Sequence, residues 1–167
     1  HRIAVSEIEL SDPVFISDLH LSSNTPQTLA AFMQFMQDVA PQHAELLILG
    51  DLFEYWSGDD EDDAVARTVI GALAQLHAKG KRLFVMHGNR DLLIGAQFCA
   101  ATGATLLVDP TVASIVTMGE HKVLLSHGDA WCTEDVAYQR FRSQVRNPEW
   151  QRQFLAQDLA ARKAFIE

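Results

Sequence analysis

Residues 83–91 read Leu83-Phe84-Val85-Met86-His87-Gly88-Asn89-Arg90-Asp91, so that an apolar run leads directly into a group of polar side chains. A short apolar run of this kind is typical of a strand that is buried on both faces. The polar residues would then lie at the carboxyl end of the strand, where open α/β sheets bind their ligands. The stretch therefore predicts an α/β fold with a functional site at one edge of the sheet.

Three further apolar runs end in the same way. They are Val14-Phe15-Ile16 before Asp18-Leu19-His20, Leu46-Leu47-Ile48-Leu49 before Gly50-Asp51, and Val123-Leu124-Leu125 before His127-Gly128-Asp129. Each run is followed by a carboxylate or an imidazole, both of which are common metal ligands. One Asp-x-His pair would carry little information, but four such coincidences in one chain predict a metal-dependent hydrolase.

Helical patterns separate the first three of these runs. Apolar residues at helical spacing predict helices over residues 26–40, 65–76 and 96–101. Pro41, Gly80 and Gly103 follow these segments and are typical helix ends. Strands that alternate with helices predict a largely parallel sheet.

This alternation stops after the third helix. Three close apolar runs at residues 105–108, 112–117 and 122–126 predict a second, more antiparallel sheet that packs on the first. From Tyr138 the chain favours helices again, with a break at Asn147-Pro148. We therefore expect an α/β protein with a two-sheet β-sandwich flanked by helices and followed by a helical cap segment.

Composition limits the class of protein. The 167 residues suffice for one domain with a substantial core, and no apolar run approaches the roughly 20 residues of a transmembrane helix. The first residues show no secretory signal. Cys99 and Cys132 are too few for a disulfide framework, which favours a reducing cytoplasm.

The charge is negative and uneven. A formal net charge of −9 argues against a nucleic-acid-binding protein, which usually carries a basic face. Residues 138–167 nevertheless contain six Lys or Arg and three Asp or Glu. This basic, aromatic segment suits an anionic, acylated ligand at a membrane surface, and it equally suits an ordinary packed helix.

Five candidate metal ligands stand at the ends of the predicted strands: Asp18, His20, Asp51, Asn89 and His127. Oxygen ligands suit hard cations and imidazole suits manganese, iron or zinc, so this mixture favours Mn²⁺. In a two-ion arrangement, Asp18 and His20 hold one ion, Asn89 and His127 hold the other, and Asp51 spans both. Two ions about 3.5 to 4 Å apart polarise phosphoryl oxygens and activate water.

Arg90 and Asp91 are the candidate catalytic residues beside these ligands. The guanidinium of Arg90 would neutralise charge on a phosphoryl group, and Asp91 would orient a neighbouring group by hydrogen bonding. The plainer interpretation is that Arg90 forms a salt bridge with Asp91. Likewise, any one of the candidate ligands by itself could be a helix cap or a buried polar group.

The acidic run at residues 59–63 has two interpretations. It looks like a calcium-binding loop but lacks the glycine and the distal glutamate of that motif. It also suits the start of a helix, where the helix dipole favours negative charge. We expect the second.

The motifs as a set resemble the calcineurin-like metallophosphoesterase superfamily, whose pattern is Asp-x-His, Gly-Asp, Gly-Asn-His-Asp/Glu, His and then Gly-His-x-His. Arg90 stands where most members have a histidine, and the final Gly-His-x-His block is absent. Residues 49–56 and 127–133 resemble the UDP-2,3-diacylglucosamine hydrolases of lipid A biosynthesis. The resemblance implies that the natural chain continues beyond Glu167.

The resemblance also implies an activity and a substrate site. The reaction would cleave the pyrophosphate bond of UDP-2,3-diacylglucosamine into 2,3-diacylglucosamine 1-phosphate and UMP, by water attack at the α-phosphorus with two Mn²⁺ ions. Asn89, Arg90, Trp56, Asp135 and Tyr138 would bind the substrate. A helical cap after Tyr138 would shelter the acyl chains. The protein would be a peripheral membrane protein at the cytoplasmic face of a bacterial inner membrane.

These expectations divide the chain into a phosphoesterase core at residues 1–137 and the start of a cap at residues 138–167. We expect no nucleic-acid partner and no obligate protein partner. Trp150 and Phe154 either pack within the cap or contact acyl chains. Two alternative functions remain: a metallophosphoesterase for another nucleotide diphosphate or phosphodiester, and a non-catalytic scaffold of the same fold.

Overall fold

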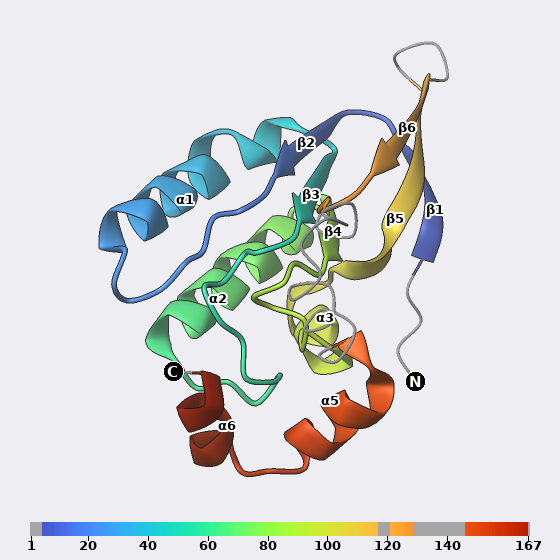
Figure 1. Ribbon diagram of the computed structural model, residues 1–167. Helices are drawn as coiled ribbons and strands as arrows, with labels where there is room; N and C mark the ends of the chain where they lie inside the picture. Colours follow the sequence, from blue (N-terminus) through green and yellow to red (C-terminus); the bar gives the residue numbers. More distant parts are fainter. Residues whose placement is uncertain (1–4, 117–120, 129–145, 167) are drawn as a thin grey trace.

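The computed structural model describes residues 5–116, 121–128 and 146–166 (Figure 1). Within them the strands are β1 (Val5–Leu10), β2 (Pro13–Ile16), β3 (Glu45–Leu49), β4 (Arg82–Met86), β5 (Thr105–Ile115) and β6 (His121–Leu125). They form one sheet in the order β1-β5-β4-β3-β2, with β6 paired to β5. Only the β5–β6 pair is antiparallel among these described strands. The predicted α/β class is confirmed.

The helices lie where helical spacing predicts them. They are α1 (Pro26–Asp38), followed by the 3-10 turn η1 (Ala40–Gln42), then α2 (Ala64–Ala78), α3 (Ala96–Thr102), α5 (Pro148–Leu155) and α6 (Leu159–Ile166). Asn147 caps α5 by accepting hydrogen bonds from the backbone N–H groups of Glu149 and Trp150. The break that separates α5 from α6 was not predicted.

The predicted second sheet is continuous with the first. β5 is one strand whose residues 105–107 pair with β4, while residues 111–115 pair with β6, and Leu107 and residues 112–115 pair with β1. Ala113 and Ile115 from this second part cluster with Phe84 and Met86 of β4. The two layers of the expected sandwich are therefore two halves of a single hydrogen-bonded sheet, and β5 runs through both.

The opposite face of the central strands forms the larger core. Successive side chains of a strand point to opposite faces, so Leu46 and Ile48 lie on one face of β3 while Leu47 lies on the other. Leu46 and Ile48 cluster with buried side chains of the three helices α1, α2 and α3, such as Phe32 and Val69. This two-sided burial explains why the strands read as continuous apolar runs.

The strand β1 was not predicted. Its residues alternate, so that Ile8 and Leu10 are buried while Glu7 and Glu9 are exposed. Two apolar residues separated by an acid are a weaker signal than the unbroken runs of β3 and β4. The strand nevertheless pairs with β5 along the second half of the sheet.

Candidate metal centre

The parallel strands β2, β3 and β4 end at the same edge of the sheet, so the loops that follow them lie side by side. Ile16 of β2 pairs with Ile48 of β3, which pairs with Val85 of β4. The loops after β2 and β3 then continue this pairing beyond the strands. The backbone N–H of Asp18 donates to the carbonyl of Gly50 (3.1 Å), and that of His20 donates to the carbonyl of Asp51 (2.9 Å).

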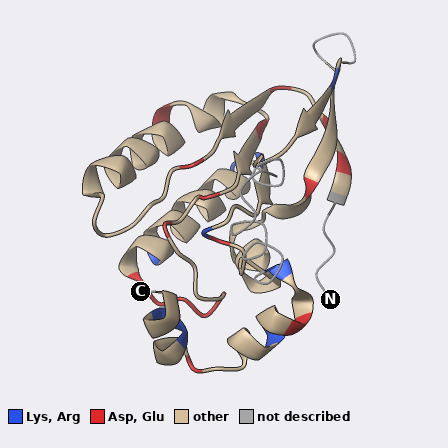
Figure 2. Cartoon of the chain, in the orientation of Figure 1, with Lys and Arg blue, Asp and Glu red and all other residues tan. Residues whose placement is uncertain are grey.

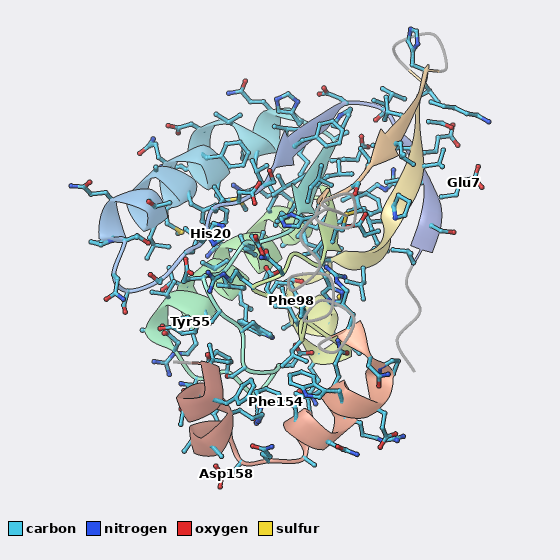
Figure 3. All side chains as sticks on the ribbon, in the orientation of Figure 1. Glu7, His20, Tyr55, Phe98, Phe154 and Asp158 are labelled. Carbon is cyan, nitrogen blue, oxygen red and sulfur yellow. The ribbon has the colours of Figure 1, made fainter. Side chains whose placement is uncertain are left out.

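These three candidate ligands share an unusual backbone conformation. The φ angles of Asp18, His20 and Asp51 are 56°, 49° and 53°. This left-handed region is uncommon for residues other than glycine, and it costs about 1 to 3 kcal/mol per residue at sites that hold it for function. One ligand atom from each of these side chains lies within 4.8 Å of the others. Figure 3 labels the side chain of His20 in the loop after β2.

His127 reaches the same point from β6. Because β6 is antiparallel to β5, its carboxyl end returns toward residue 109, where Asp109 accepts hydrogen bonds from the backbone N–H of His127 (3.3 Å) and the hydroxyl of Ser126 (2.6 Å). The Nδ1–H of His127 donates to the carbonyl of Leu49 (3.0 Å). Its Nε2 is thereby left 3.3 Å from Asp51 Oδ2, an orientation typical of a metal-binding histidine.

Asn89 contacts Asp51 through its side-chain amide, whose NH₂ donates to Asp51 Oδ1 (3.0 Å) and Oδ2 (2.6 Å). A Cβ on Gly88 would lie 2.1 Å from Asp51 Oδ1, so only glycine permits this close approach. The carboxylates, imidazoles and amide of the centre are ligand types that suit divalent cations.

The electrostatics of the centre favour cation binding at Asp51. Burial acts to raise the pKa of Asp51, but hydrogen bonds from His127 and from the N–H of Arg90 outweigh it, so the pKa lies below its ordinary value. The same contact with Asp51 raises the pKa of His127 to about 9. The carboxylate is therefore ionised at neutral pH, and a cation that binds His127 displaces a proton.

Glu54 is a member of the centre that the sequence analysis did not identify. One carboxylate oxygen lies 3.3 Å from His20 Nδ1, and the other lies 3.5 Å from Arg90 Nη1. This contact leaves His20 Nε2 facing Asp51 Oδ2 at 3.6 Å. Glu54 thus joins a candidate ligand to a candidate phosphate-binding residue. Its position only three residues after Asp51 was the available signal.

Asp91 is a positioning residue rather than one that touches a substrate. Its side chain is completely buried, and burial raises the pKa of its carboxyl to about 6. It accepts hydrogen bonds from the backbone N–H groups of Gly88 (2.9 Å), Asp51 (3.3 Å), Leu52 (2.8 Å) and Phe53 (3.4 Å). Asp91 therefore holds the loops after β3 and β4 together. It lies too deep for a direct catalytic role, and the ion pair of Arg90 is with Glu54.

An apolar groove of about 530 Å³ opens beside Arg90. It is lined by Glu54, Tyr55, Trp56, Asn89, Arg90, Leu92, Leu93, Trp150, Phe154, Phe165 and Ile166. Trp56 is only 2% exposed, because it stacks on Phe53 at 4.7 Å and packs edge-on against Phe98. It therefore borders the groove from within the core. The other two predicted substrate residues, Asp135 and Tyr138, lie outside the described residues, as does the predicted boundary at residue 137.

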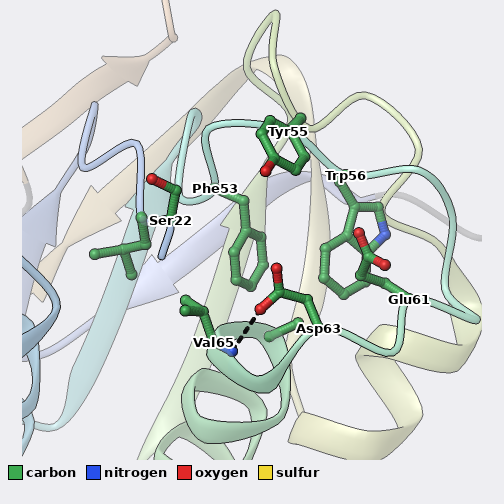
Figure 4. Close-up of a pocket in the computed structure, with 9 residues that line it drawn as sticks. Ser22, Phe53, Tyr55, Trp56, Glu61, Asp63 and Val65 are labelled. Carbon is green, nitrogen blue, oxygen red and sulfur yellow. Dashed lines mark hydrogen bonds between the residues drawn. The ribbon is translucent and has the colours of Figure 1, made fainter. Parts of the chain in front are cut away.

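The acidic run at residues 59–63 has three different roles. Asp63 caps α2 by accepting a hydrogen bond from the N–H of Val65 at 2.7 Å, as Figure 4 shows. Asp59 accepts from the N–H groups of Gly95 (2.9 Å) and Phe98 (3.0 Å) at the start of α3. The residues between them pair with α6. The predicted helix start is confirmed for Asp63, while the rest of the run connects distant elements.

Comparisons with known proteins agree with this geometry. The sequence profile of the calcineurin-like phosphoesterases matches residues 13–164, a segment that contains the five candidate ligands. Among the described residues, no helix combines the length and apolar character needed to cross a bilayer.

Curated relatives carry a common name. The UDP-2,3-diacylglucosamine hydrolase of Cellvibrio japonicus is 47% identical over 151 residues, which are 90% of this chain and 62% of the relative. That of Aromatoleum aromaticum is 49% identical over 154 residues, with 92% and 62% covered. That of Haemophilus influenzae is 45% identical over 153 residues, with 92% and 63% covered. The chain thus spans about three fifths of the length of these relatives. By its profile match, the chain belongs to the calcineurin-like phosphoesterase family.

Proposed function

We propose that this chain carries the catalytic centre of a metal-dependent hydrolase that cleaves the pyrophosphate bond of UDP-2,3-diacylglucosamine. The products would be 2,3-diacylglucosamine 1-phosphate and UMP. The observation that carries the proposal is the convergence of the candidate ligands on Asp51, next to a groove that is polar at one end and apolar at the other. The names of the relatives support the choice of substrate.

The metals are proposed to be two Mn²⁺ ions. We propose that Asp18 and His20 hold one ion and that Asn89 and His127 hold the other, with Asp51 shared between them. The imidazoles of His20 and His127 both face Asp51 Oδ2, at 3.6 and 3.3 Å. Divalent ions bound here would supply Lewis acidity at the phosphoryl oxygens and a nucleophile derived from water. The family as a whole implies divalent metal ions, and the mixture of oxygen and nitrogen donors favours manganese.

We propose that Arg90 binds the phosphate groups. Its side chain is 55% exposed and is held beside the ligands by Glu54, so the guanidinium can turn to a substrate without a large movement. A guanidinium binds phosphate oxygens in a bidentate manner and neutralises the charge that develops on the leaving group. Asn89 adds a neutral ligand, which avoids repelling the anionic substrate.

The apolar end of the groove suits acyl chains. Trp150 and Phe154 of α5 stack on each other at 5.1 Å, and Phe165 of α6 packs edge-on against Phe154 at 5.4 Å. These rings both pack within the cap segment and line the groove, so the two interpretations of Trp150 and Phe154 are compatible. Because such a substrate is a lipid, we propose a peripheral position at the cytoplasmic face of the inner membrane.

Calorimetric titration with Mn²⁺, followed by assays of UMP release, tests the proposal. We expect stoichiometric Mn²⁺ binding and hydrolysis that prefers UDP-2,3-diacylglucosamine to UDP-N-acetylglucosamine. Absence of stoichiometric binding would favour the non-catalytic scaffold. Equal rates on the two substrates would favour a phosphoesterase of broader or different specificity.

Replacement of Glu54 by glutamine should weaken Mn²⁺ binding by about 10- to 100-fold, the usual effect of removing a group that orients a metal-binding histidine. The glutamine keeps the length of the side chain but removes the charge that holds His20 Nδ1–H and Arg90. Calorimetry measures the affinity. Glu7→Gln, an exposed glutamate on β1, is the matched control. An E54Q affinity equal to that of the control would show that Glu54 does not support the metal centre.

A further inference from the structure

Arg162 of α6 is a buried arginine with a complete set of partners. Its side chain is 3% exposed, and its two terminal nitrogens bind the two carboxylate oxygens of Asp60 at 2.9 and 2.5 Å. Its Nη1 also donates to the carbonyl of Ser57, and its Nε donates to the carbonyl of Gln157 at 3.0 Å. A fork of this kind fixes direction as well as distance.

Lys163 adds a second connection to the same acidic loop. Its Nζ lies 2.7 Å from Asp62 Oδ1 and 2.9 Å from Glu61 Oε2, and the side chain of Glu61 is 2% exposed. Figure 2 shows acidic residues of this loop and basic residues of α6 side by side near the C-terminus. We call the contacts of Arg162 and Lys163 with residues 57–62 the α6 clasp.

The α6 clasp requires glycine at position 58. Its φ of +141° lies in a region that other residues rarely adopt, and a Cβ there would lie 2.3 Å from Arg162 Nη1. The same Cβ would approach Leu155 Cδ2 of α5 to 3.0 Å. The loop therefore lacks a side chain at the one point where the guanidinium crosses it.

The clasp joins two walls of the groove. The segment from Asp51 to Asp62 carries a candidate metal ligand, then Glu54, then Trp56 at the edge of the groove, and finally the acidic partners of α6. On the other side, Phe165 and Ile166 follow the clasp residues on α6 and line the groove. The position of the apolar wall relative to the metal centre therefore depends on the clasp.

Apolar packing contributes to this position but does not fix it alone. Phe154 is 5% exposed within the main core and Trp150 and Ile166 pack against it, whereas Phe165 is 64% exposed and its ring contacts are with Phe154 at 5.4 Å and Trp150 at 6.2 Å. Hydrophobic contact is not directional, so these contacts do not by themselves set the orientation of α6. The bidentate contact between Arg162 and Asp60 supplies that direction.

We propose that Arg162 is a positioning residue that sets the reach of the groove, and thereby the length of acyl chain that fits between α6 and the metal centre. This inference rests on the proposed function in taking an acyl chain as the occupant of the apolar end. It assigns to the acidic run a role in substrate selection that is separate from catalysis.

The test compares R162K with R152K in the full chain. R162K keeps the charge but loses the fork, while Arg152 is an exposed arginine of α5 and serves as the matched control. We expect R162K to weaken binding of the best-fitting fluorescent fatty acid by roughly fourfold for each methylene that no longer fits the groove. The preference among chain lengths should flatten, while Mn²⁺ affinity and Mn²⁺-dependent cleavage of bis(p-nitrophenyl) phosphate stay at the wild-type level.

A second variant keeps the inference falsifiable if R162K is poorly folded. G58A keeps the arginine at position 162, but the added methyl group obstructs the approach of its guanidinium to the acidic loop. We expect the same flattened chain-length profile. If both variants lower the unfolding midpoint yet keep the wild-type profile, the clasp is only structural and the inference is overturned. A wild-type chain that binds no fatty-acid probe overturns it too. A chain that binds the probe but neither Mn²⁺ nor substrate overturns the proposed function instead.

Discussion

Asp51→Asn should abolish stoichiometric Mn²⁺ binding and reduce hydrolysis by on the order of 10³-fold or more, equivalent to about 4 kcal/mol of lost transition-state stabilisation. Asp51 faces both imidazoles of the centre, at 3.6 Å from His20 and 3.3 Å from His127. Asparagine keeps one oxygen for the N–H of Arg90 but loses the charge that attracts the cations. Calorimetry and UMP release measure the two effects.

The control for this substitution is Asp12→Asn. Asp12 is an exposed aspartate that pairs with His43 at 3.1 Å. It precedes β2 in the sequence, whereas Asp18 and His20 follow that strand. It should retain wild-type Mn²⁺ affinity. If D51N binds Mn²⁺ as tightly as D12N does, Asp51 is not the shared ligand and the two-ion arrangement is wrong.

Asp91→Asn should lower the free energy of unfolding by about 2 to 4 kcal/mol, because each buried donor that loses its acceptor costs about 1 to 3 kcal/mol. Each carboxylate oxygen of Asp91 accepts from two backbone N–H groups. Asparagine supplies one acceptor oxygen and places an NH₂ group against the other two donors. Urea denaturation of the metal-free protein measures the loss.

The same substitution should weaken Mn²⁺ binding, because the loops that carry Asp51 and Asn89 meet at Asp91. D12N is again the matched control, and surface substitutions of this kind usually stay within about 0.5 kcal/mol. An unfolding free energy for D91N within that range would show that the buried hydrogen bonds do not hold the loops. Unchanged Mn²⁺ affinity in a destabilised D91N would separate stability from ligand placement.

Local sequence patterns predicted the central strands and the helices that cover them, because the strands are buried on both faces and therefore consist of unbroken apolar runs. The unbroken apolar runs of β3 and β4 identified the strands, and the polar residues after them identified the edge of the sheet. Helical spacing identified α1, α2 and α3 in the same way. These signals depend on neighbours in the sequence, so no knowledge of the fold was needed to find them.

The missed features depend on partners that are distant in the chain. β1 alternates buried and exposed side chains over residues 7–10, and β5 was predicted as two strands because Asp109-Pro110 interrupts its apolar pattern. Glu54 belongs to the centre only because the loops after β2 and β4 reach it. The acidic run could be assigned to a helix start from sequence, but its contacts with α6 could not.

Residue types and their spacing alone were enough to name the α/β class, the family resemblance and five candidate ligands, because each ligand follows one of four strands by two to four residues. Only the tertiary structure showed that Asp91 is completely buried against the loop after β3 and that Arg162 pairs with Asp60. Burial and contacts across more than 100 residues arise only when the chain folds, and no local pattern encodes them.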